Sequence, residues 1–235
     1  NRILYKYKKT KIEKNSSFKL RVSEKIFSLP IQKKISLIDK DTFYFLNETR
    51  SLSKVGWNGN RDDISKLWRY NQHYFDYLNS SVSSQQKKWL NHLLIDWVNK
   101  NNIGKGPGWE SYPTSIRIVN WIKWHFLKNN LSKSCIHSLV LQSRWLSKRI
   151  EWHILGNHLF TNAKALVFVG LFFSSEESKI WLKKGLEIID DELNEQVLSD
   201  GGNFELSPMY HSIFLEDLLD LINISKVYPK IINQR

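Results

Sequence analysis

The sequence has little of the chemistry that marks disulfide-rich or metal-binding proteins, because it holds one cysteine, Cys135, in 235 residues. A single cysteine excludes an internal disulfide framework and a cysteine metal cluster, and we expect a buried thiol without a role. No apolar run approaches the roughly 18 to 20 residues that span a bilayer. His-Glu-x-x-His, a glycine-rich phosphate loop and a Gly-x-Ser-x-Gly elbow are also missing. We therefore predict no cofactor and no metal site.

The chain also lacks an even charge balance, with a formal net charge of +12. Residues 1–60 carry 14 Lys and Arg against 5 Asp and Glu, whereas the remaining residues carry 21 against 18. A basic stretch such as Lys6 to Lys19 is typical of a solvated surface or tail, and it would also suit an acidic polysaccharide. The near-neutral balance after residue 60 argues against a nucleic-acid-binding groove, so we expect no nucleic-acid partner.

Apolar residues from Trp68 onward recur with the period of a helix. In residues 84–100, Trp89, Leu93 and Trp97 mark one face that a strand could not present. The same period predicts the following helices: 67–79, 84–100, 114–128, 132–152, 157–173, 176–197 and 208–227. Short loops between them favour antiparallel hairpins, so we predict an all-α fold with little strand after Trp57.

Two predicted helix starts carry capping signals, whereas residues 1–56 show little evidence of helix. Ser174 followed by Glu177 fits a capping box, and Ser207 before Pro208 fits a capped start with proline at the first helical position. Residues 101–113 and 199–207 are rich in turn residues and predict loops. Residues 1–56 show poor helix evidence, with a β-favouring run at Phe43 and Phe45. We interpret them as a short, extended, peripheral and basic N-terminal segment.

Polar groups gather at two of the predicted helix starts, in residues 151–163 and 201–211. Asn157 and His158 follow Gly156 where one helix begins, and Tyr210 lies in the first turn of another. The partial positive charge of a helix start could hold a sugar carboxylate and would favour a tyrosinate. From the pattern alone, a helix cap and two structural side chains are the more common explanation of the same residues.

Aromatic residues are more numerous than a helical core needs: ten Trp, nine Tyr and twelve Phe. Most single Trp side chains belong to cores. Trp109 and Tyr112, however, fall in or beside a glycine-rich loop with no helical face to bury them. Flat aromatic faces beside polar groups suit the apolar faces of sugar rings.

Four segments resemble the heparinase II/III family. They are LWRYNQHYFDYL at 67–78, GWESYPTSIRIVNW at 108–121, and the two polar segments above, and they occur in the order of that family. The resemblance implies an incomplete (α/α) toroid, here residues 57–235, that ends before a C-terminal β-sandwich domain. It also implies cleavage of a uronic-acid polysaccharide by β-elimination, with a further catalytic His or Tyr supplied from outside this chain.

The resemblance assigns roles residue by residue. Asn157 and His158 match the pair that neutralises the uronate carboxylate and handles protons, and Tyr210 matches the general acid, which also acts as base for some sugar configurations. Weaker candidates for substrate binding are the following: His73, Trp109, Arg117, Glu205 and His211. We expect the catalytic side chains to point into one concavity, with Trp109 and Arg117 on its wall.

Two function classes stay open at this point. The first is a polysaccharide lyase, with heparan-like glycosaminoglycan, alginate or a bacterial surface polymer as substrate, in degradation or in polysaccharide assembly. The second is a catalytically silent carbohydrate-binding helical module or fragment. The lyase reading predicts a periplasmic or extracellular protein, although no secretory signal is present in the sequence.

Overall fold

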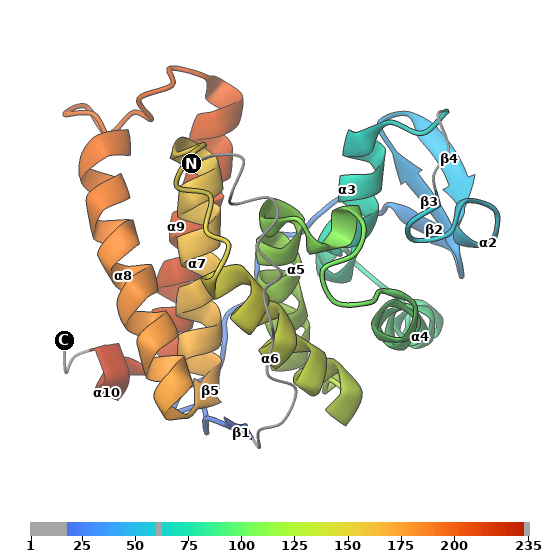
Figure 1. Cartoon of the computed structure of the whole chain (residues 1–235), viewed down its shortest axis with the longest axis horizontal. Coiled ribbons are helices and arrows are strands. Elements are labelled where there is room, and N and C mark those ends of the chain that lie inside the picture. The colour runs from blue at the N-terminus through green and yellow to red at the C-terminus, as the bar shows by residue number, and fades with distance from the viewer. Residues whose placement is uncertain (1–17, 60–62, 233–235) are drawn as a thin grey trace.

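The computed structural model describes residues 18–59 and 63–232 and is mostly helical (Figure 1). The seven main helices are α3 (Lys66–Tyr74), α4 (Ser84–Lys100), α5 (Ser111–Trp124), α6 (Lys133–Ser147), α7 (Gly156–Phe172), α8 (Glu176–Gln196) and α9 (Pro208–Val227). Shorter elements are α2 (Leu52–Val55), α10 (Pro229–Ile232), the 3-10 helices η1 (Asp76–Asn79) and η2 (Pro107–Trp109), and the π-helix η3 (His125–Asn129). Within the described residues, no helix is long and apolar enough to cross a membrane.

Most helices begin at a serine that caps the first turn. Ser83 and Gln86 form a capping box at the start of α4. At α9 the expected arrangement is confirmed, since Ser207 accepts a hydrogen bond from the Tyr210 amide and Pro208 takes the first helical position. The box at the start of α8 is formed by Ser175 and Ser178, one residue later than the sequence suggested. Side-chain caps satisfy amides that the helix itself leaves without partners.

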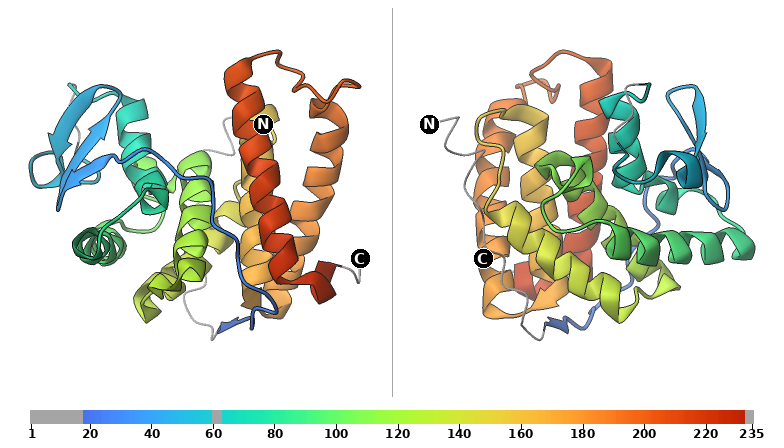
Figure 2. Two further views of the ribbon diagram at one scale, coloured as in Figure 1. Left: turned by 180° about the vertical axis from the view of Figure 1, so that it is seen from behind. Right: turned by 45° about the vertical axis from the view of Figure 1, so that its right-hand side comes forward.

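Helices α5, α7 and α9 lie side by side and run in the same direction (Figures 1 and 2). Residues near the start of each helix contact residues near the start of the next one. Tyr112 of α5 stacks on His158 of α7 with ring centroids 4.3 Å apart. Phe160 of α7 lies 4.5 Å from Phe214 of α9. The starts of all three helices therefore lie at one end of the molecule.

Helices α6 and α8 run in the opposite direction to their neighbours. Arg117 of α5 donates to Gln142 of α6, while Trp145 further along α6 donates to Trp109 just before α5. Contacts between α7 and α8 fall in the same reversed order, which makes antiparallel hairpins. The predicted hairpin architecture is confirmed in this respect, and the toroid itself stays a prediction.

Three short antiparallel strands precede the helices: β2 (Leu37–Asp39), β3 (Thr42–Phe45) and β4 (Glu48–Ser51). Phe43 and Phe45 of β3 are buried against Trp57, Trp68 and Tyr77. The sheet therefore shares the apolar core of the helices, at the far end of the molecule from α8 (Figure 1). The described part of the segment in β2 to β4 is thus not peripheral in its packing, while the domain boundary at residue 56 stays a prediction.

Strand structure after Trp57 is limited, in the described residues, to β5 (Phe173–Ser174), which pairs with β1 (Lys19–Leu20). This pairing ties the N-terminal chain to the far end of α7, where Arg21 donates to the carbonyls of Leu171 and Phe173. Residues 6–17 of the predicted basic tail lie outside the described residues.

Candidate functional site

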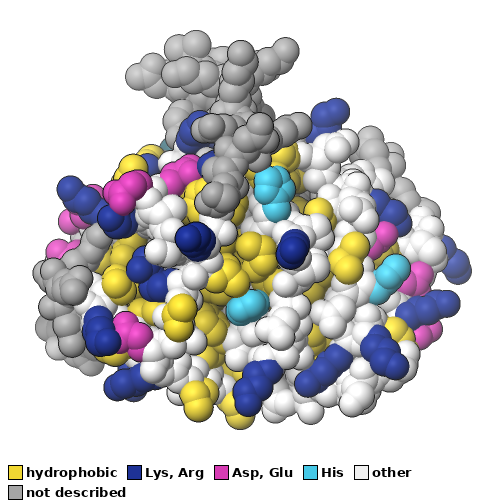
Figure 3. Space-filling view, turned by 90° about the horizontal axis from the view of Figure 1, so that it is seen from below, with side chains coloured by type: hydrophobic (Ala, Val, Ile, Leu, Met, Phe, Trp, Pro, Cys, Tyr) yellow, Lys and Arg dark blue, Asp and Glu magenta, His cyan; other side chains and the backbone are white. Residues whose placement is uncertain are grey.

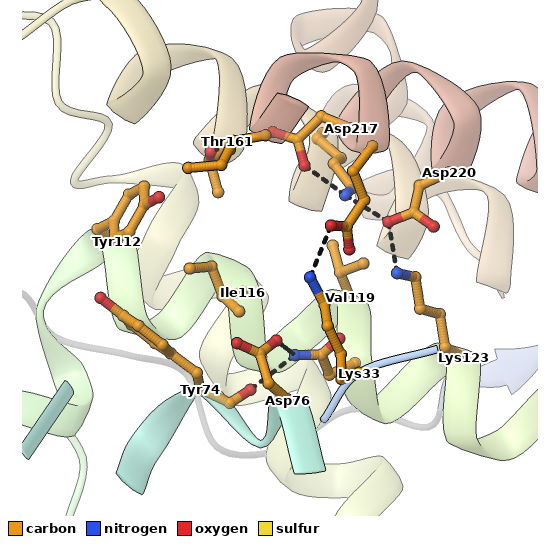
Figure 4. Close-up of a pocket in the computed structure, with 14 residues that line it drawn as sticks. Lys33, Tyr74, Asp76, Tyr112, Ile116, Val119, Lys123, Thr161, Asp217 and Asp220 are labelled. Atoms are coloured by element: carbon orange, nitrogen blue, oxygen red, sulfur yellow. Dashed lines mark hydrogen bonds and ion pairs between the residues drawn. The ribbon is translucent and has the colours of Figure 1, made fainter. Parts of the chain in front are cut away.

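A cavity of about 240 Å³ opens between α5, α7, α9 and η1 (Figure 4). Tyr74 and Tyr112 form one wall, and charged side chains from α7 and α9 form the other. The two tyrosine rings meet edge to face at 6.0 Å. Burial raises the pKa of the Tyr112 hydroxyl above its ordinary value, so this group faces the cavity as a neutral phenol.

Four buried charges lie at the floor of this cavity. Lys164 of α7 pairs with Asp217 at 2.7 Å and with Asp220 at 2.5 Å, both on α9. Lys123 of α5 pairs with the same Asp220 oxygen at 2.5 Å. Burial alone would raise the pKa of Asp220, but Lys164 and Lys123 hold it below its ordinary value. The cluster is neutral in sum and joins all three parallel helices.

The mouth of the cavity is also lined by paired groups. Lys33 pairs with Glu216 at 2.6 Å. Asn120 donates from its amide to the Asp76 carboxylate at 2.8 Å. Polar partners beside the aromatic wall give the cavity the mixed character of a site for a polar ligand with apolar faces.

Asn157 and His158 lie half-buried in the first turn of α7, and neither lines this cavity, although Thr161 in the following turn does. His158 stacks on Tyr112, whose ring lines the cavity wall. Its Nδ1 lies 3.3 Å from a carboxylate oxygen of Glu151. Glu151 is bound in turn by Asn162. The Asn162 side chain accepts a hydrogen bond from the Glu151 backbone amide and donates one to the Glu151 carboxylate. The histidine ring is therefore held by its stacking on Tyr112, while its buried Nδ1 makes no hydrogen bond within the described residues.

Tyr210 lies half-buried in the first turn of α9. Ile213, one turn later, lines the same cavity as Thr161, one turn after His158. The two candidate starts therefore lie at the same end of the helix layer and are followed by cavity-lining residues. This placement supports the expected convergence of the catalytic side chains, which stays a proposal.

Glu205 and His211 are exposed around the start of α9. The Glu205 carboxylate lies near Gly156, since a Cβ placed on that glycine would be 3.7 Å from it. His211 accepts a hydrogen bond at Nδ1 from the Asn203 amide at 3.3 Å. Both side chains are free to face a ligand, and their binding roles stay predictions.

His73, Trp109 and Arg117 require a correction, because each is at most 3% exposed and has no surface to offer a substrate. Arg117 stacks on Trp97 at 3.9 Å and donates to Gln142. Burial and Arg117 lower the pKa of His73 to about 3. These three side chains belong to the core beneath the site, and Trp109 does not lie on a groove wall.

The floor cluster was missed from the sequence, although signals for it exist. Lys164 is the one charged residue in the otherwise apolar or neutral middle of α7, and a charge there needs a buried partner. Asp217 and Asp220 are three residues apart and so share a face of α9. Among residues 18–59 and 63–232, no group of three His, Cys, Asp or Glu side chains could hold a metal ion.

Basic side chains are spread over the end of the molecule that faces away from these helix starts. Figure 3 shows this end from below, with Lys and Arg side chains scattered among polar and apolar surface. Among the described residues visible in this view, they do not gather into one continuous basic patch.

Known proteins resemble this chain in sequence and fold. A heparin-sulfate lyase of Bacteroides stercoris is 39% identical over 100 residues, which cover 42% of this chain and 14% of that protein. A heparin-sulfate lyase of Pedobacter heparinus is 32% identical over 163 residues, which cover 61% of this chain and 24% of that protein. The crystal structure of heparinase III aligns with a TM-score of 0.56 at 20% identity, over 73% of this chain and 28% of that chain.

The solved structure supports the fold alone, and the chain spans between 14% and 28% of the length of these relatives. The family model described as Heparinase II/III N-terminus matches residues 45–230. This range includes the aromatic cavity wall, the floor cluster and both polar helix starts. Because the match covers most of the chain, the protein belongs to the heparinase II/III family.

Proposed function

We propose that the full-length protein is a lyase that cleaves a uronic-acid polysaccharide by β-elimination. The observation that supports the proposal is that Asn157, His158 and Tyr210 lie in the first turns of two parallel helices whose next turns, at Thr161 and Ile213, line one cavity, in a member of this family. Two relatives are named heparin-sulfate lyases, so a heparan-type glycosaminoglycan is the first substrate to test.

The reaction needs three groups. The C6 carboxylate of the uronate must be neutralised, because the C5 proton is otherwise too weakly acidic. A base then removes that proton, the electron pair forms the C4–C5 double bond, and the C4–O4 bond breaks. The departing O4 takes a proton from an acid. The products are one fragment with a new reducing end, whose hydroxyl contains O4, and one fragment with an unsaturated uronate at its non-reducing end. No oxidant or reductant is involved.

We assign these tasks to the helix starts. Asn157 donates from its side-chain amide to the uronate carboxylate, assisted by the partial positive charge of the α7 start. His158, with Nδ1 directed at Glu151, offers Nε2 to the same carboxylate or to the C5 proton. Tyr210 protonates O4 and, for sugars whose C5 proton faces it, also removes that proton. A polymer substrate of this kind suits a periplasmic or extracellular protein.

The test is the ultraviolet absorbance of newly formed unsaturated uronate ends when the full-length protein meets purified polysaccharides. Heparan sulfate, alginate and an acidic bacterial surface polymer are compared with a neutral polysaccharide as control. Absorbance must rise with at least one uronate polymer and stay flat with the neutral one. Binding of a uronate polymer without any rise would favour a silent carbohydrate-binding module and overturn the lyase proposal.

A further inference from the structure

One of the two ion pairs between α7 and α9, Lys164–Asp217, lies at equal depth below the two candidate helix starts, and Asp220, the second partner of Lys164, lies three residues further along α9. Lys164 follows Asn157 by seven residues (157 to 164), and Asp217 follows Tyr210 by seven (210 to 217). A helix rises about 1.5 Å per residue, so each partner lies about 10 Å below its helix start. Parallel helices joined at equal depth have their starts at one level.

These ion pairs are deeply buried, with side-chain exposures of 6% for Lys164, 13% for Asp217 and 4% for Asp220. Buried ion pairs lose hydration, and well-packed apolar residues in their place are often equally stable. Stability alone therefore does not explain them. What an apolar contact cannot supply is a fixed axial position, because apolar surfaces can slide along one another whereas an ammonium group requires its carboxylates at one point.

A third helix is joined at the same point. Lys123 of α5 contacts the Asp220 oxygen that also contacts Lys164. Tyr112, which stacks on His158, lies on this same helix α5. The cluster thus links the elements that carry His158, its stacking partner and Tyr210.

We propose that Lys164, with Asp217 and Asp220, acts as a register lock: these positioning residues hold Asn157 and Tyr210 at one level, so that both reach the same uronate. The inference rests on the proposed function, because it concerns how that site is held. The cluster lies at the floor of the cavity, about 10 Å below the helix starts, and we place its effect on the reaction in the relative position of the two helices.

The test uses the full-length protein with the double substitution Lys164→Met/Asp217→Leu. It removes one positive and one negative charge and leaves the Lys123–Asp220 pair intact, so no buried charge loses its last partner. We expect kcat to fall roughly 10- to 100-fold, because a displacement near 1 Å at a reacting group has effects of this size. We expect KM to change by less than about threefold, since Asn157, His158 and Tyr210 at the helix starts remain.

The matched control is Arg144→Met/Glu177→Leu, which removes an ion pair of 2.9 Å between α6 and α8. That pair joins two helices that carry none of the three candidate residues. Its effect on the melting temperature is measured beside that of the first substitution, and it should leave kcat within about twofold. Equal losses of kcat in the two variants, or a loss that tracks melting temperature, would show a merely structural role and overturn the register lock.

A second measurement reads the register without any turnover. Spin labels are placed on exposed residues beside the two helix starts, by Ile154→Cys and Met209→Cys, with Cys135→Ser to remove the native thiol. The distance distribution between the labels should shift or broaden on Lys164→Met/Asp217→Leu and stay unchanged in the control. An unchanged distribution refutes the lock. A changed distribution in a protein that cleaves no uronate polymer refutes the proposed function instead.

Discussion

His73 is a buried histidine whose proton position follows from its two partners. Trp97 donates its indole N–H to Nδ1 at 3.0 Å, so the ring proton resides on Nε2 and is donated to the Trp57 carbonyl at 3.0 Å. Burial and the nearby Arg117 lower the pKa to about 3. The ring therefore stays neutral in the folded protein, whereas it takes up a proton near pH 6.5 in the unfolded chain.

This difference predicts a loss of stability on acidification. Between about pH 6.5 and pH 3 the unfolded chain holds one proton more at His73, so the free energy of unfolding falls by roughly 1.4 kcal/mol per pH unit from this group. His73→Gln keeps a donor and an acceptor but removes the titration. The free energy of unfolding, measured with urea at pH 7, 6, 5 and 4, should fall less steeply with decreasing pH in the variant than in the wild type. Identical slopes would contradict the assigned protonation state.

Tyr210 allows a second prediction at this scale. Tyr210→Phe removes one hydroxyl and keeps the ring, so in the full-length protein kcat should fall roughly a thousandfold with little change in melting temperature. Asn157→Ala should also lower turnover, because the developing charge loses a donor worth roughly 3 to 4 kcal/mol. Both are measured by absorbance of unsaturated ends and by thermal unfolding. Wild-type turnover in Tyr210→Phe would remove this residue from the mechanism.

At the scale of elements, α7 and α8 approach closely because two glycines leave room. A Cβ on Gly170 would lie 2.6 Å from the Leu182 side chain, and one on Gly185 would lie 2.9 Å from the Ala163 carbonyl oxygen. Backbone atoms of the neighbouring helix can move only if the helix moves. These glycines therefore fix the distance between α7 and α8, and with it the support behind α7.

Gly185→Ala should consequently destabilise the protein, although alanine normally favours a helix over glycine by about 1 kcal/mol. Overpacking of a close helix contact costs about 1–3 kcal/mol, so the steric effect is expected to win. The measurement is the midpoint of urea unfolding. A midpoint equal to that of the wild type, or higher, would mean that the two helices separate without loss.

Helix positions were predictable because their signals are local. The predicted bounds of α4 and α9 are confirmed, since a capping serine and an apolar period mark them. Helix α6 ends at Ser147, earlier than residue 152, because distant groups bind the following backbone: Ser111 donates to the Arg149 carbonyl and the Glu151 amide donates to Asn162. Such competition between tertiary and helical hydrogen bonds leaves no local trace in the sequence.

At the scale of the whole molecule, features of the site that depend on local sequence could be predicted, whereas features that depend on contacts between helices could not. Asn157 and Tyr210 could be placed at helix starts from neighbouring residues alone. Burial of Arg117 and pairing of Lys164 with Asp217 depend on which helices meet, and at what depth. The sequence motifs therefore predicted the helix starts. Which side chains lie beneath those starts is shown only by the packing of the helices.

The charge of the whole chain bears on how the proposed substrate, an acidic polymer, would be captured. The net charge is +12, of which residues 1–60 contribute +9, and an acidic polysaccharide is attracted by such an excess. Salt screens this attraction, with a Debye length of about 8 Å near physiological ionic strength. KM for a uronate polymer should therefore rise with salt concentration, while kcat, which reflects chemistry in the bound complex, should change little.

The N-terminal lysines are expected to contribute most of this salt dependence. Replacing Lys6, Lys8, Lys9 and Lys11 by Gln removes four charges from the most basic part of the chain, so KM should rise at low salt and depend less steeply on salt. The control replaces four exposed lysines of α4 and α8, Lys87, Lys88, Lys179 and Lys183, and changes the net charge equally. If both variants shift KM to the same extent, total charge governs capture and the N-terminal segment has no special part. A larger rise in KM for the N-terminal variant, with kcat unchanged in both variants, would show that the N-terminal segment attracts the polymer electrostatically.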